Sequence, residues 1–414
     1  MKPAQPLMSL DDALQHMLQK VQPLADVETL PLAQALGRVL RQPLHARIDV
    51  PPQDNSAMDG YALSLADWPQ PWPEAGVVLP VSQRVAAGHL PQPLQPGTAA
   101  RIFTGAFVPP GADAVLMQEQ TEVLQPGVPG QVRLLAAPTP GQAIRRRGED
   151  LRADHEVLSA GLRLQAGALG LAAAAGHASV TVSRRPRVAL FSTGDELMQP
   201  GDAPRPGAIY NSNRTLLQAL LQDWGCEVLD LGMVPDQLDA TRAALRTAAA
   251  QADLVLTTGG VSVGEEDHIK AAVQAEGALQ LWQIAMKPGK PLAFGQVGPA
   301  QQPVWFVGLP GNPVSSWVTC LLTVRPLLLR LQGASELQPQ ALQLPAAFAW
   351  PRPDKRREFL RARLNDQGAL ELFRNQGSGV LSSAVWADGL VDVAAGQTIE
   401  PGQPVRFLPL SQLR

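Results

Sequence analysis

The chain has 414 residues, with 34 Lys and Arg against 37 Asp and Glu and a formal net charge of −3. This length predicts about two to four domains, and the near-neutral charge gives no electrostatic support for nucleic acid as a partner. The two cysteines, Cys226 and Cys320, each lie in an apolar run, which argues against a disulfide framework or a structural zinc site.

The cysteine usage and the N-terminus together predict a cytoplasmic protein. The chain begins MKPAQPLMSLDDAL, with acids where a signal peptide has an apolar core. No window reaches the roughly 18 uninterrupted apolar residues that a membrane span requires. We therefore expect neither a membrane span nor a membrane partner.

The N-terminal region shows helical patterns. Ser9 precedes two acids and an apolar repeat at helical spacing from Leu10 to Val21, which predicts a capped helix. The segment from Leu30 to Leu36 predicts a second short helix that ends at Gly37. Residues 38–52 then indicate one or two strands that run into prolines.

A β-rich module follows. From residue 53 to about 135 the chain consists of short β-type segments separated by Pro and Gly, with helical patterns on both sides, so we expect an inserted β domain. The triplet Arg145–Arg147, closed by Gly148, Glu149 and Asp150, indicates either a solvated basic face or an ion-paired hinge. Residues 164–176 predict an alanine-rich helix, and 177–186 a short strand with a basic linker.

From Arg187 to Leu331, apolar strands alternate with helices of ten to fifteen residues. This order predicts a mostly parallel sheet with helices on both faces. In such doubly wound folds the ligand binds beyond the carboxyl ends of the strands. After Gly333 the pattern is again β and predicts a barrel or sandwich of about 75 residues.

The segment LVLTTGGVSVGEED, residues 254–267, is the most informative stretch. Its strand ends in a glycine turn whose hydroxyls and free N–H groups could hold an anion, and acids follow directly. A phosphate beside acids implies a cation between them, so we expect a metal-bridged phosphate ligand. The candidate binding residues of this turn are Thr258, Gly259, Gly260, Ser262 and Gly264.

Three carboxylates follow successive strands of the predicted sheet: Glu196, Asp236 and Asp267. Each alone is equally well explained as a helix cap in a solvated turn. Together they predict converging acids, which need a cation, and oxygen ligands with substrate phosphate suit Mg²⁺. Among Glu265, Glu266 and Asp267, we favour Asp267 as the metal ligand.

Two further loops follow strands of the same sheet. Lys287 and Lys290 frame a Pro-Gly turn, and they either solubilise a hairpin or balance a phosphate. The second loop either caps a helix or adds polar groups to the site; its candidates are Pro310, Gly311, Asn312, Pro313 and Ser315. No dinucleotide, P-loop or hydrolase motif occurs, and the histidines lack metal-ligand spacing.

The motifs occur together in an order that resembles the MoeA family of molybdopterin molybdenumtransferases, whose relatives include the E domain of gephyrin. The shared motifs, from about Leu7 to the C-terminus, are SAMDGYA, RIFTGA, GADAVLMQEQTE, RRRGED, STGDEL with YNSNR, TTGGVSVGEED, MKPGKPLAFG and GLPGNPVS. The resemblance implies that adenylyl-molybdopterin and molybdate react with Mg²⁺, releasing AMP and leaving molybdenum on the dithiolene.

The same resemblance implies an elongated subunit and a homodimer. The implied parts are an N-terminal helix within 1–26 that packs on the central domain, a linking domain at 27–51 and 146–183, an inserted β domain at 52–145, a central α/β domain at 184–332 that is similar to molybdopterin adenylyltransferase, and a C-terminal β barrel at 337–414. Molybdopterin adenylyltransferase and molybdoenzyme maturation proteins are the implied partners.

Carried over motif by motif, the family's functional positions form two groups. The implied catalytic positions are Asp59, Thr104 and Asp150 in the N-terminal half, and Glu196, Asp236, Asp267, Lys287 and the Pro310–Pro313 loop in the central domain. The first group would reach the central site of the other subunit. Gln283 stands where some relatives have a lysine.

Two other functions remain open. The first is a molybdopterin adenylyltransferase, because the central domain alone resembles one; the extra β domains argue against it. The second is a non-catalytic scaffold that binds molybdopterin, against which the set of acids speaks.

Overall fold

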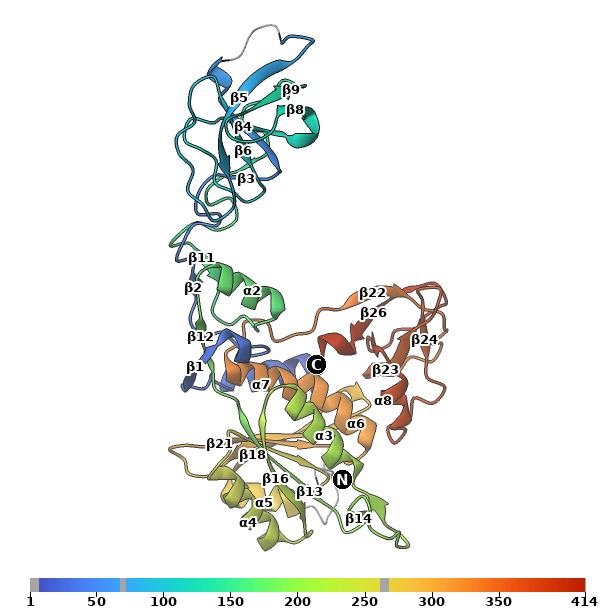
Figure 1. The fold of residues 1–414 in the computed structure, drawn as a ribbon. Helices are drawn as coiled ribbons and strands as arrows, with labels where there is room; N and C mark the ends of the chain where they lie inside the picture. The colour runs from blue at the N-terminus through green and yellow to red at the C-terminus, as the bar shows by residue number, and fades with distance from the viewer. Residues whose placement is uncertain (1–6, 68–71, 261–267, 414) are drawn as a thin grey trace.

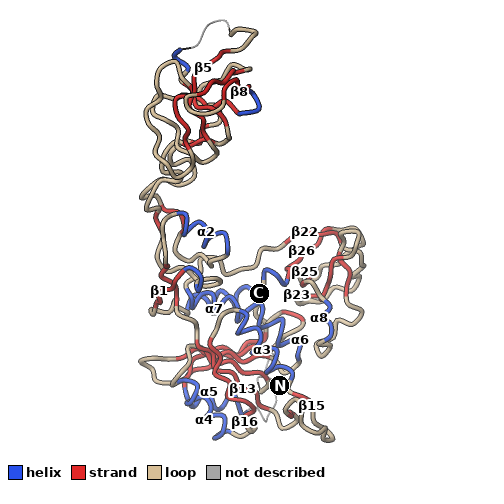
Figure 2. Tube along the Cα trace, in the orientation of Figure 1, coloured by secondary structure: helices blue, strands red, loops and turns tan. Residues whose placement is uncertain are grey.

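The structure is a computed structural model that describes residues 7–67, 72–260 and 268–413. Figure 1 shows an elongated molecule in which a β-rich module stands at one end and a narrow neck joins it to a larger body. The C-terminal strands lie beside that body. In Figure 2 the regular elements of the module are mostly strands, whereas the body combines a central sheet with helices around it.

The N-terminal helix α1 (Leu10–Lys20) begins where the sequence predicted. The Ser9 side chain accepts a hydrogen bond from the Asp12 N–H and so satisfies one of the free donors at the helix start. The buried face of α1 belongs to the hydrophobic core of the central sheet. The helix is therefore part of the body although the chain then leaves for the neck.

The neck consists of short elements from two separate segments. Strand β1 pairs with β12, and β2 pairs with β11, in both cases antiparallel. The bounds of these elements are β1 Val27–Pro31, β2 Leu44–His45, β11 Glu156–Leu158, α2 Ala166–Ala174 and β12 Ser179–Ser183.

The prediction of a helix from Leu30 to Leu36 is wrong. Residues up to Pro31 form β1, and only a single 3-10 turn, Leu32–Gln34, follows. The reason is tertiary: β1 is held by its pairing with β12, about 150 residues later in the chain, and such pairing overrides a weak local preference.

The inserted module contains a six-stranded sheet in the order β7-β4-β6-β5-β9-β8. A separate pair, β3 with β10, closes the module where it meets the neck. The bounds are β3 Asn55–Ser56, β4 Gly60–Leu63, β5 Val77–Val85, β6 Ala99–Ile102, β7 Ala114–Met117, β8 Thr121–Gln125, β9 Gly130–Leu134 and β10 Ile144–Arg145, with 3-10 turns at Leu65–Asp67 and Gln118–Gln120.

The central sheet has the order β16-β13-β17-β21-β20-β18. The first four strands are parallel, and β20 and β18 continue the sheet antiparallel. The bounds are β13 Arg187–Thr193, α3 Ser212–Asp223, β16 Glu227–Val234, α4 Leu238–Ala249, β17 Leu254–Thr258, α5 His268–Glu276, β18 Gly277–Gln283, β20 Pro291–Val297 and β21 Val304–Leu309. This architecture confirms the predicted fold class.

Alternate side chains of each central strand enter different cores. In β13, Val188 and Leu190 pack in the core that holds α1, α3 and the last helices of the sheet, whereas Ala189 and Phe191 pack with α4 and α5. A strand that is apolar on both faces is expected when helices cover both sides of a sheet. The helices on both faces of the sheet hold the carboxyl ends of its strands in fixed positions along one edge.

The closing helix is continuous from Pro313 to Gln332 and comprises α6 (Pro313–Thr319), a π-helical turn (Cys320–Val324) and α7 (Arg325–Gln332). By length and composition it could cross a membrane, but 94% of its apolar window is buried inside the protein. Such burial is the usual condition of a core helix, and the search of the described residues finds one such stretch only.

The C-terminal β domain is joined to the body through its own sheet. A short strand of the central region, β19 (Met286–Lys287), pairs in parallel with β23, so the order is β19-β23-β25-β26-β22 with β24 on β23. The bounds are β22 Leu342–Pro345, β23 Arg357–Leu364, β24 Leu370–Leu372, α8 Ser382–Trp386, β25 Gly389–Val393 and β26 Pro404–Pro409, followed by a 3-10 turn at Leu410–Gln412.

Candidate active site

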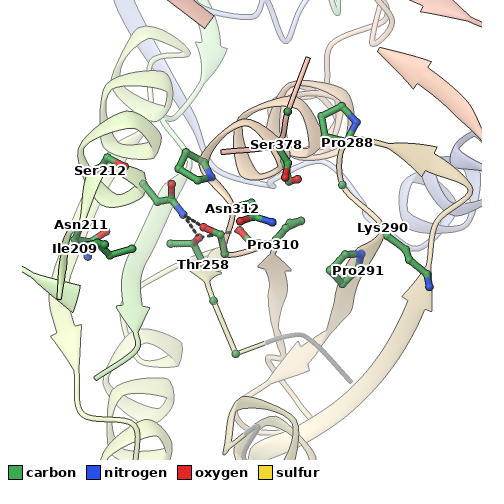
Figure 3. A pocket seen from close by; sticks show the side chains of 18 of the residues that line it. Ile209, Asn211, Ser212, Thr258, Pro288, Lys290, Pro291, Pro310, Asn312 and Ser378 are labelled. Atoms are coloured by element: carbon green, nitrogen blue, oxygen red, sulfur yellow. Dashed lines mark hydrogen bonds between the residues drawn. The ribbon is translucent and has the colours of Figure 1, made fainter. Parts of the chain in front are cut away.

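A cavity of about 700 Å³ opens at the carboxyl ends of the parallel strands β13, β17 and β21. It contains the last residues of β13 and β17, Thr193 and Thr258, and the loop that begins at Pro310 after β21. Figure 3 views it from close by. Its location is the one expected for a ligand in a doubly wound sheet.

The cavity brings together many residues that the sequence singled out. Those that line it are Glu196, Thr258, Gly259, Gly260, Lys287, Lys290, Pro310, Gly311, Asn312, Pro313 and Ser315. Ser262, Gly264 and Asp267 lie outside the described residues. Asp236, after the edge strand β16, does not line the cavity.

A buried hydrogen-bond network ties the strand ends together. The Asn213 amide donates to Thr258 Oγ1 at 2.9 Å and to the Gly311 carbonyl at 2.7 Å. Thr258 Oγ1 in turn donates to the Pro310 carbonyl at 3.1 Å. Figure 3 marks these bonds by dashed lines. They join the start of α3, the end of β17 and the loop after β21 into one unit.

The sequence analysis did not assign Asn211 and Asn213 to the site. Asn211 is the N-cap of α3 and accepts a hydrogen bond from the Arg214 N–H. The motif YNSNR was noted for the resemblance, but its physical signal is an Asn-Ser-Asn run at a helix start beyond a strand, where polar side chains face the ligand edge.

Three buried polar atoms at the cavity have no hydrogen-bond partner among the described residues: Thr193 Oγ1, Asn211 Nδ2 and Asn213 Oδ1. Leaving such an atom unsatisfied costs about 1–3 kcal/mol each. All three atoms belong to residues that line the cavity, which is therefore suited to a polar ligand that supplies the missing partners.

Two glycines at the strand ends leave room for neighbouring groups. At Gly194, with φ +146°, an added Cβ would lie 2.6 Å from Glu196 Oε2, so the carboxylate of Glu196 occupies the space beside the bare backbone. At Gly259, with φ +87°, a Cβ would lie 2.8 Å from the Thr193 carbonyl oxygen. Both positions favour glycine for its conformation, and Gly259 also needs the missing side chain because the atom it faces is backbone; at Gly194 an added Cβ would displace the Glu196 carboxylate.

The described oxygen atoms of the cavity fit Mg²⁺ only if a bound substrate supplies further ligands. Among the described residues, no group of three or more His, Cys, Asp or Glu side chains could hold a metal. Glu196 does line the cavity, and the unpaired Thr193 hydroxyl is another oxygen nearby. Mg²⁺ commonly takes one or two carboxylates and completes its ligands with phosphate and water.

Lys287 is held by the C-terminal domain. Its ammonium lies 2.9 Å from Glu358 Oε1 and 3.5 Å from Asp354 Oδ2, and Glu358, only 2% exposed, accepts a further hydrogen bond from Trp350 Nε1. Lys290 makes no ion pair within the described ranges, and in Figure 3 its side chain extends away from Thr258. Lys290 is thus the freer of the two cations.

Residues of the C-terminal domain form one wall of the cavity: Arg356, Gln376, Gly377 and Ser378. The Arg356 guanidinium hydrogen-bonds both oxygens of Asp354, and this lowers the pKa of the Asp354 carboxyl to about 2. Gln376 exchanges hydrogen bonds with the backbone of Arg361 in β23. No motif marked these residues, because they come from a different domain.

Asp59 and Thr104 contact each other in the inserted module. Asp59 Oδ1 accepts hydrogen bonds from the Thr104 N–H and hydroxyl, both at 2.8 Å, and these lower the pKa of the Asp59 carboxyl. Asp59 precedes β4 and Thr104 follows β6, which are neighbouring antiparallel strands. Neither residue lines the central cavity of its own chain, and the module stands far from it in Figure 1.

Asp150 lies at the neck. It lines a separate hollow of about 560 Å³ with Arg146, Arg147 and Arg152. Arg146 pairs with Asp54, and Arg147 pairs with Asp49. These contacts support the interpretation of the arginine run as an ion-paired hinge.

Comparisons with known proteins agree with this arrangement. Residues 8–176 match the family model described as MoeA N-terminal region (domain I and II), 189–330 match a probable molybdopterin binding domain, and 343–410 match MoeA C-terminal region (domain IV). A curated relative from Haemophilus influenzae, named molybdopterin molybdenumtransferase, is 39% identical over 95% of this chain and 98% of its own length. A relative of the same name from Nostoc is 35% identical over 99% of this chain and 95% of its own.

Solved structures show the same likeness. The molybdopterin biosynthesis MoeA protein from Pyrococcus horikoshii superimposes with a TM-score of 0.83 at 27% identity and covers 98% of this chain and 100% of its own. A second structure titled as a molybdopterin biosynthesis MoeA protein from the same organism gives a TM-score of 0.76 at 30% identity, with 98% of this chain and 99% of that chain covered. The likeness thus extends over the inserted module, the body and the C-terminal domain together.

Proposed function

Since the chain belongs to the MoeA family, we propose that it is a molybdopterin molybdenumtransferase that works in the cavity beyond β13, β17 and β21. It is thus an enzyme of molybdenum cofactor biosynthesis. In this function, molybdate and adenylyl-molybdopterin are the substrates, Mg²⁺ assists, and AMP is released.

The observation that carries the proposal is the set of unsatisfied buried polar atoms at the strand ends. Thr193 Oγ1, Asn211 Nδ2 and Asn213 Oδ1 offer both donors and acceptors within one cavity. A pterin pyrophosphate presents the complementary groups, because it has phosphate oxygens that accept and ring amides that donate and accept.

Different residues of the cavity would serve different parts of the reaction. An oxygen of molybdate forms a bond to the phosphorus on the molybdopterin side of the pyrophosphate link, and the broken P–O bond leaves its electron pair with AMP. The two dithiolene sulfurs then form bonds to molybdenum and lose their protons, while the Mo–O bond to that phosphate breaks and leaves its electron pair on the phosphate oxygen. Glu196, against the backbone of Gly194, would hold Mg²⁺; Lys290 and Arg356 would orient the oxyanions. When bound, Mg²⁺ neutralises phosphate charge in the transition state. Asp236, Asp267 and Lys287 remain candidates for the same reaction.

The functional unit that we propose is a homodimer. In the elongated subunit, Asp59, Thr104 and Asp150 do not line the central cavity, so a second copy would have to bring them there. We also propose that the enzyme acts in the cytoplasm, where it receives its substrate from an adenylyltransferase and passes the product to maturation proteins of molybdoenzymes.

The test is to incubate the purified protein with adenylyl-molybdopterin, Mg²⁺ and molybdate and to follow AMP. Molybdate-dependent AMP release that falls strongly in Glu196→Gln is the expected result. Consumption of ATP with release of pyrophosphate would identify an adenylyltransferase instead. Tight binding of the substrate without any AMP release would identify a scaffold.

A further inference from the structure

Two arginines lie side by side on the sheet of the inserted module. Arg84 in β5 and Arg101 in β6 are register partners on parallel neighbouring strands. Both guanidinium carbons lie near the Phe103 ring, at 4.5 Å and 4.7 Å from its centroid. Arg101 also lies 5.2 Å from the Tyr61 ring centroid. Together Arg84, Phe103 and Arg101 form an arginine–phenylalanine cluster.

Neither charge of this cluster forms an ion pair with a carboxylate among the described residues. Within the part of the chain that the structure describes, Arg101 donates to two neutral oxygens, those of the Gly60 carbonyl and the Gln118 side chain. Arg84 is exposed and makes no ion pair with any described residue. By contrast, Arg133 on the same sheet pairs with Glu122 across β8 and β9.

Like charges that face each other across neighbouring strands destabilise a sheet. The stacking on Phe103 offsets part of this repulsion, but it leaves both cations available to a ligand. An anion between Arg84 and Arg101 would relieve the repulsion and gain charge-assisted hydrogen bonds.

The cluster adjoins a pair of functional candidates. Phe103 precedes Thr104 directly, and Thr104 binds Asp59 through its N–H and hydroxyl. The Asp59 carboxylate feels the charge of Arg101, although its two hydrogen bonds from Thr104 have the greater effect on its pKa. The cluster therefore lies at the end of the module that carries Asp59.

The described side chains of the central cavity provide no surplus positive charge. Its cations among the described residues are Lys287, Lys290 and Arg356. The carboxylates that line it or pair with those cations are Glu196, Asp354 and Glu358. The positive and negative charges of these side chains therefore cancel. A pyrophosphate and a molybdate dianion, by contrast, bring several negative charges.

We propose that the arginine–phenylalanine cluster is an anion subsite that binds a phosphate of the adenylyl-molybdopterin held in the partner subunit's cavity. This inference rests on the proposed function and on its shared site. Arg84 and Arg101 supply the positive charge that the cavity lacks, and they contact the substrate beside Asp59.

The first test measures AMP release as a function of adenylyl-molybdopterin concentration, at low and at high salt. In Arg84→Gln, KM is expected to rise about tenfold or more, because a charge-assisted hydrogen bond is lost. Its KM should also depend less on salt, and Arg84→Lys should restore most of the affinity. Arg133→Gln, which loses only a surface ion pair, is the matched control and should keep the wild-type KM.

An unchanged KM in both Arg84→Gln and the folded double variant Arg84→Gln/Arg101→Gln would overturn the subsite. Thermal unfolding shows whether each variant is folded; removal of one like charge is expected to leave the melting temperature unchanged or higher. If Asp59→Asn lost activity while Arg84→Gln kept its KM, the shared site would survive and the subsite alone would fail.

The second test uses hybrid dimers of the double arginine variant with Glu196→Gln. If the cluster acts across the dimer, one of the two sites pairs an intact cavity with an intact cluster. At an adenylyl-molybdopterin concentration well below the raised KM of the double arginine variant, the hybrid should then show about half of the wild-type activity, although each parent dimer retains little activity. No recovery in a verified hybrid would overturn the action across the dimer, and full activity of Glu196→Gln alone would instead refute the proposed catalytic cavity.

Discussion

Replacing Gly194 by alanine should impair the enzyme by moving the carboxylate of Glu196. The new Cβ would lie 2.6 Å from Glu196 Oε2 and 3.0 Å from Cδ, whereas ordinary contacts begin at 3.4 Å. The carboxylate therefore has to retreat by about 0.8 Å. Misplacing a catalytic group by about 1 Å can cost a hundredfold in rate, so we expect kcat/KM for AMP release to fall about ten- to a hundredfold.

The backbone contributes a separate effect. Gly194 has φ +146°, and an L-residue held in such a conformation is strained by about 1–3 kcal/mol. Gly201→Ala is the matched control, because Gly201 lies in the same loop region at φ +99° but has nothing within 4 Å of an added Cβ. It should carry the backbone strain without touching Glu196.

The assay is a titration of AMP release with Mg²⁺ for the wild type, both alanine variants and Glu196→Gln. Gly194→Ala should need more Mg²⁺ for half-maximal rate, and Gly201→Ala should not. Adding Gly194→Ala to Glu196→Gln should cost little more, because the carboxylate that the alanine displaces is already absent. If the two alanine variants had the same Mg²⁺ dependence and rate, the role assigned to Glu196 would be refuted.

The other expectations concern protonation and burial. Thr104→Val removes one of the hydrogen bonds that favour the ionised Asp59 carboxylate, so the pKa of Asp59 should rise toward the ordinary 3.8. The acidic limb of the pH–rate profile should then move to higher pH. A limb that does not move would contradict the contact. Arg356 lowers the pKa of Asp354 to about 2. The stability that the wild type gains over Asp354→Asn should therefore be complete above about pH 4 and should be lost as the pH falls toward 2. Equal urea midpoints of the two proteins at every pH would contradict this stabilising ion pair. Burial raises the pKa of Cys226 to about 12 and leaves both thiols inaccessible, so a thiol reagent at neutral pH should label neither cysteine until the body unfolds, and fast labelling of the native protein would refute that burial.

The sequence alone indicated the loops that form the edge of the cavity, because their position depends on the order of strands and helices. The Thr258–Gly260 turn and the Pro310–Pro313 loop follow strands of a doubly wound sheet, and such loops gather at one edge whatever the rest of the fold does. The same reasoning placed Glu196 at the cavity. Asp236 follows the edge strand β16 and is not among the described residues that line the cavity, so its role stays a prediction.

Long-range contacts explain what the sequence did not reveal. Arg356 and Ser378 reach the cavity because β19 joins the sheet of the C-terminal domain, a pairing of only two residues with no sequence signal. The ion pair of Lys287 with Glu358 depends on that same pairing. The wrongly predicted helix at Leu30–Leu36 has an equivalent cause, since β12 supplies the partner that turns its first residues into a strand.

The most direct test of the central claim is to locate molybdenum by its anomalous scattering in crystals of the protein grown with molybdate and AMP. A peak is expected in the cavity beyond β13, β17 and β21, within contact of the wall that Arg356 and Ser378 form. A molybdenum peak elsewhere on the protein, with none in this cavity, would contradict the assignment of the active site.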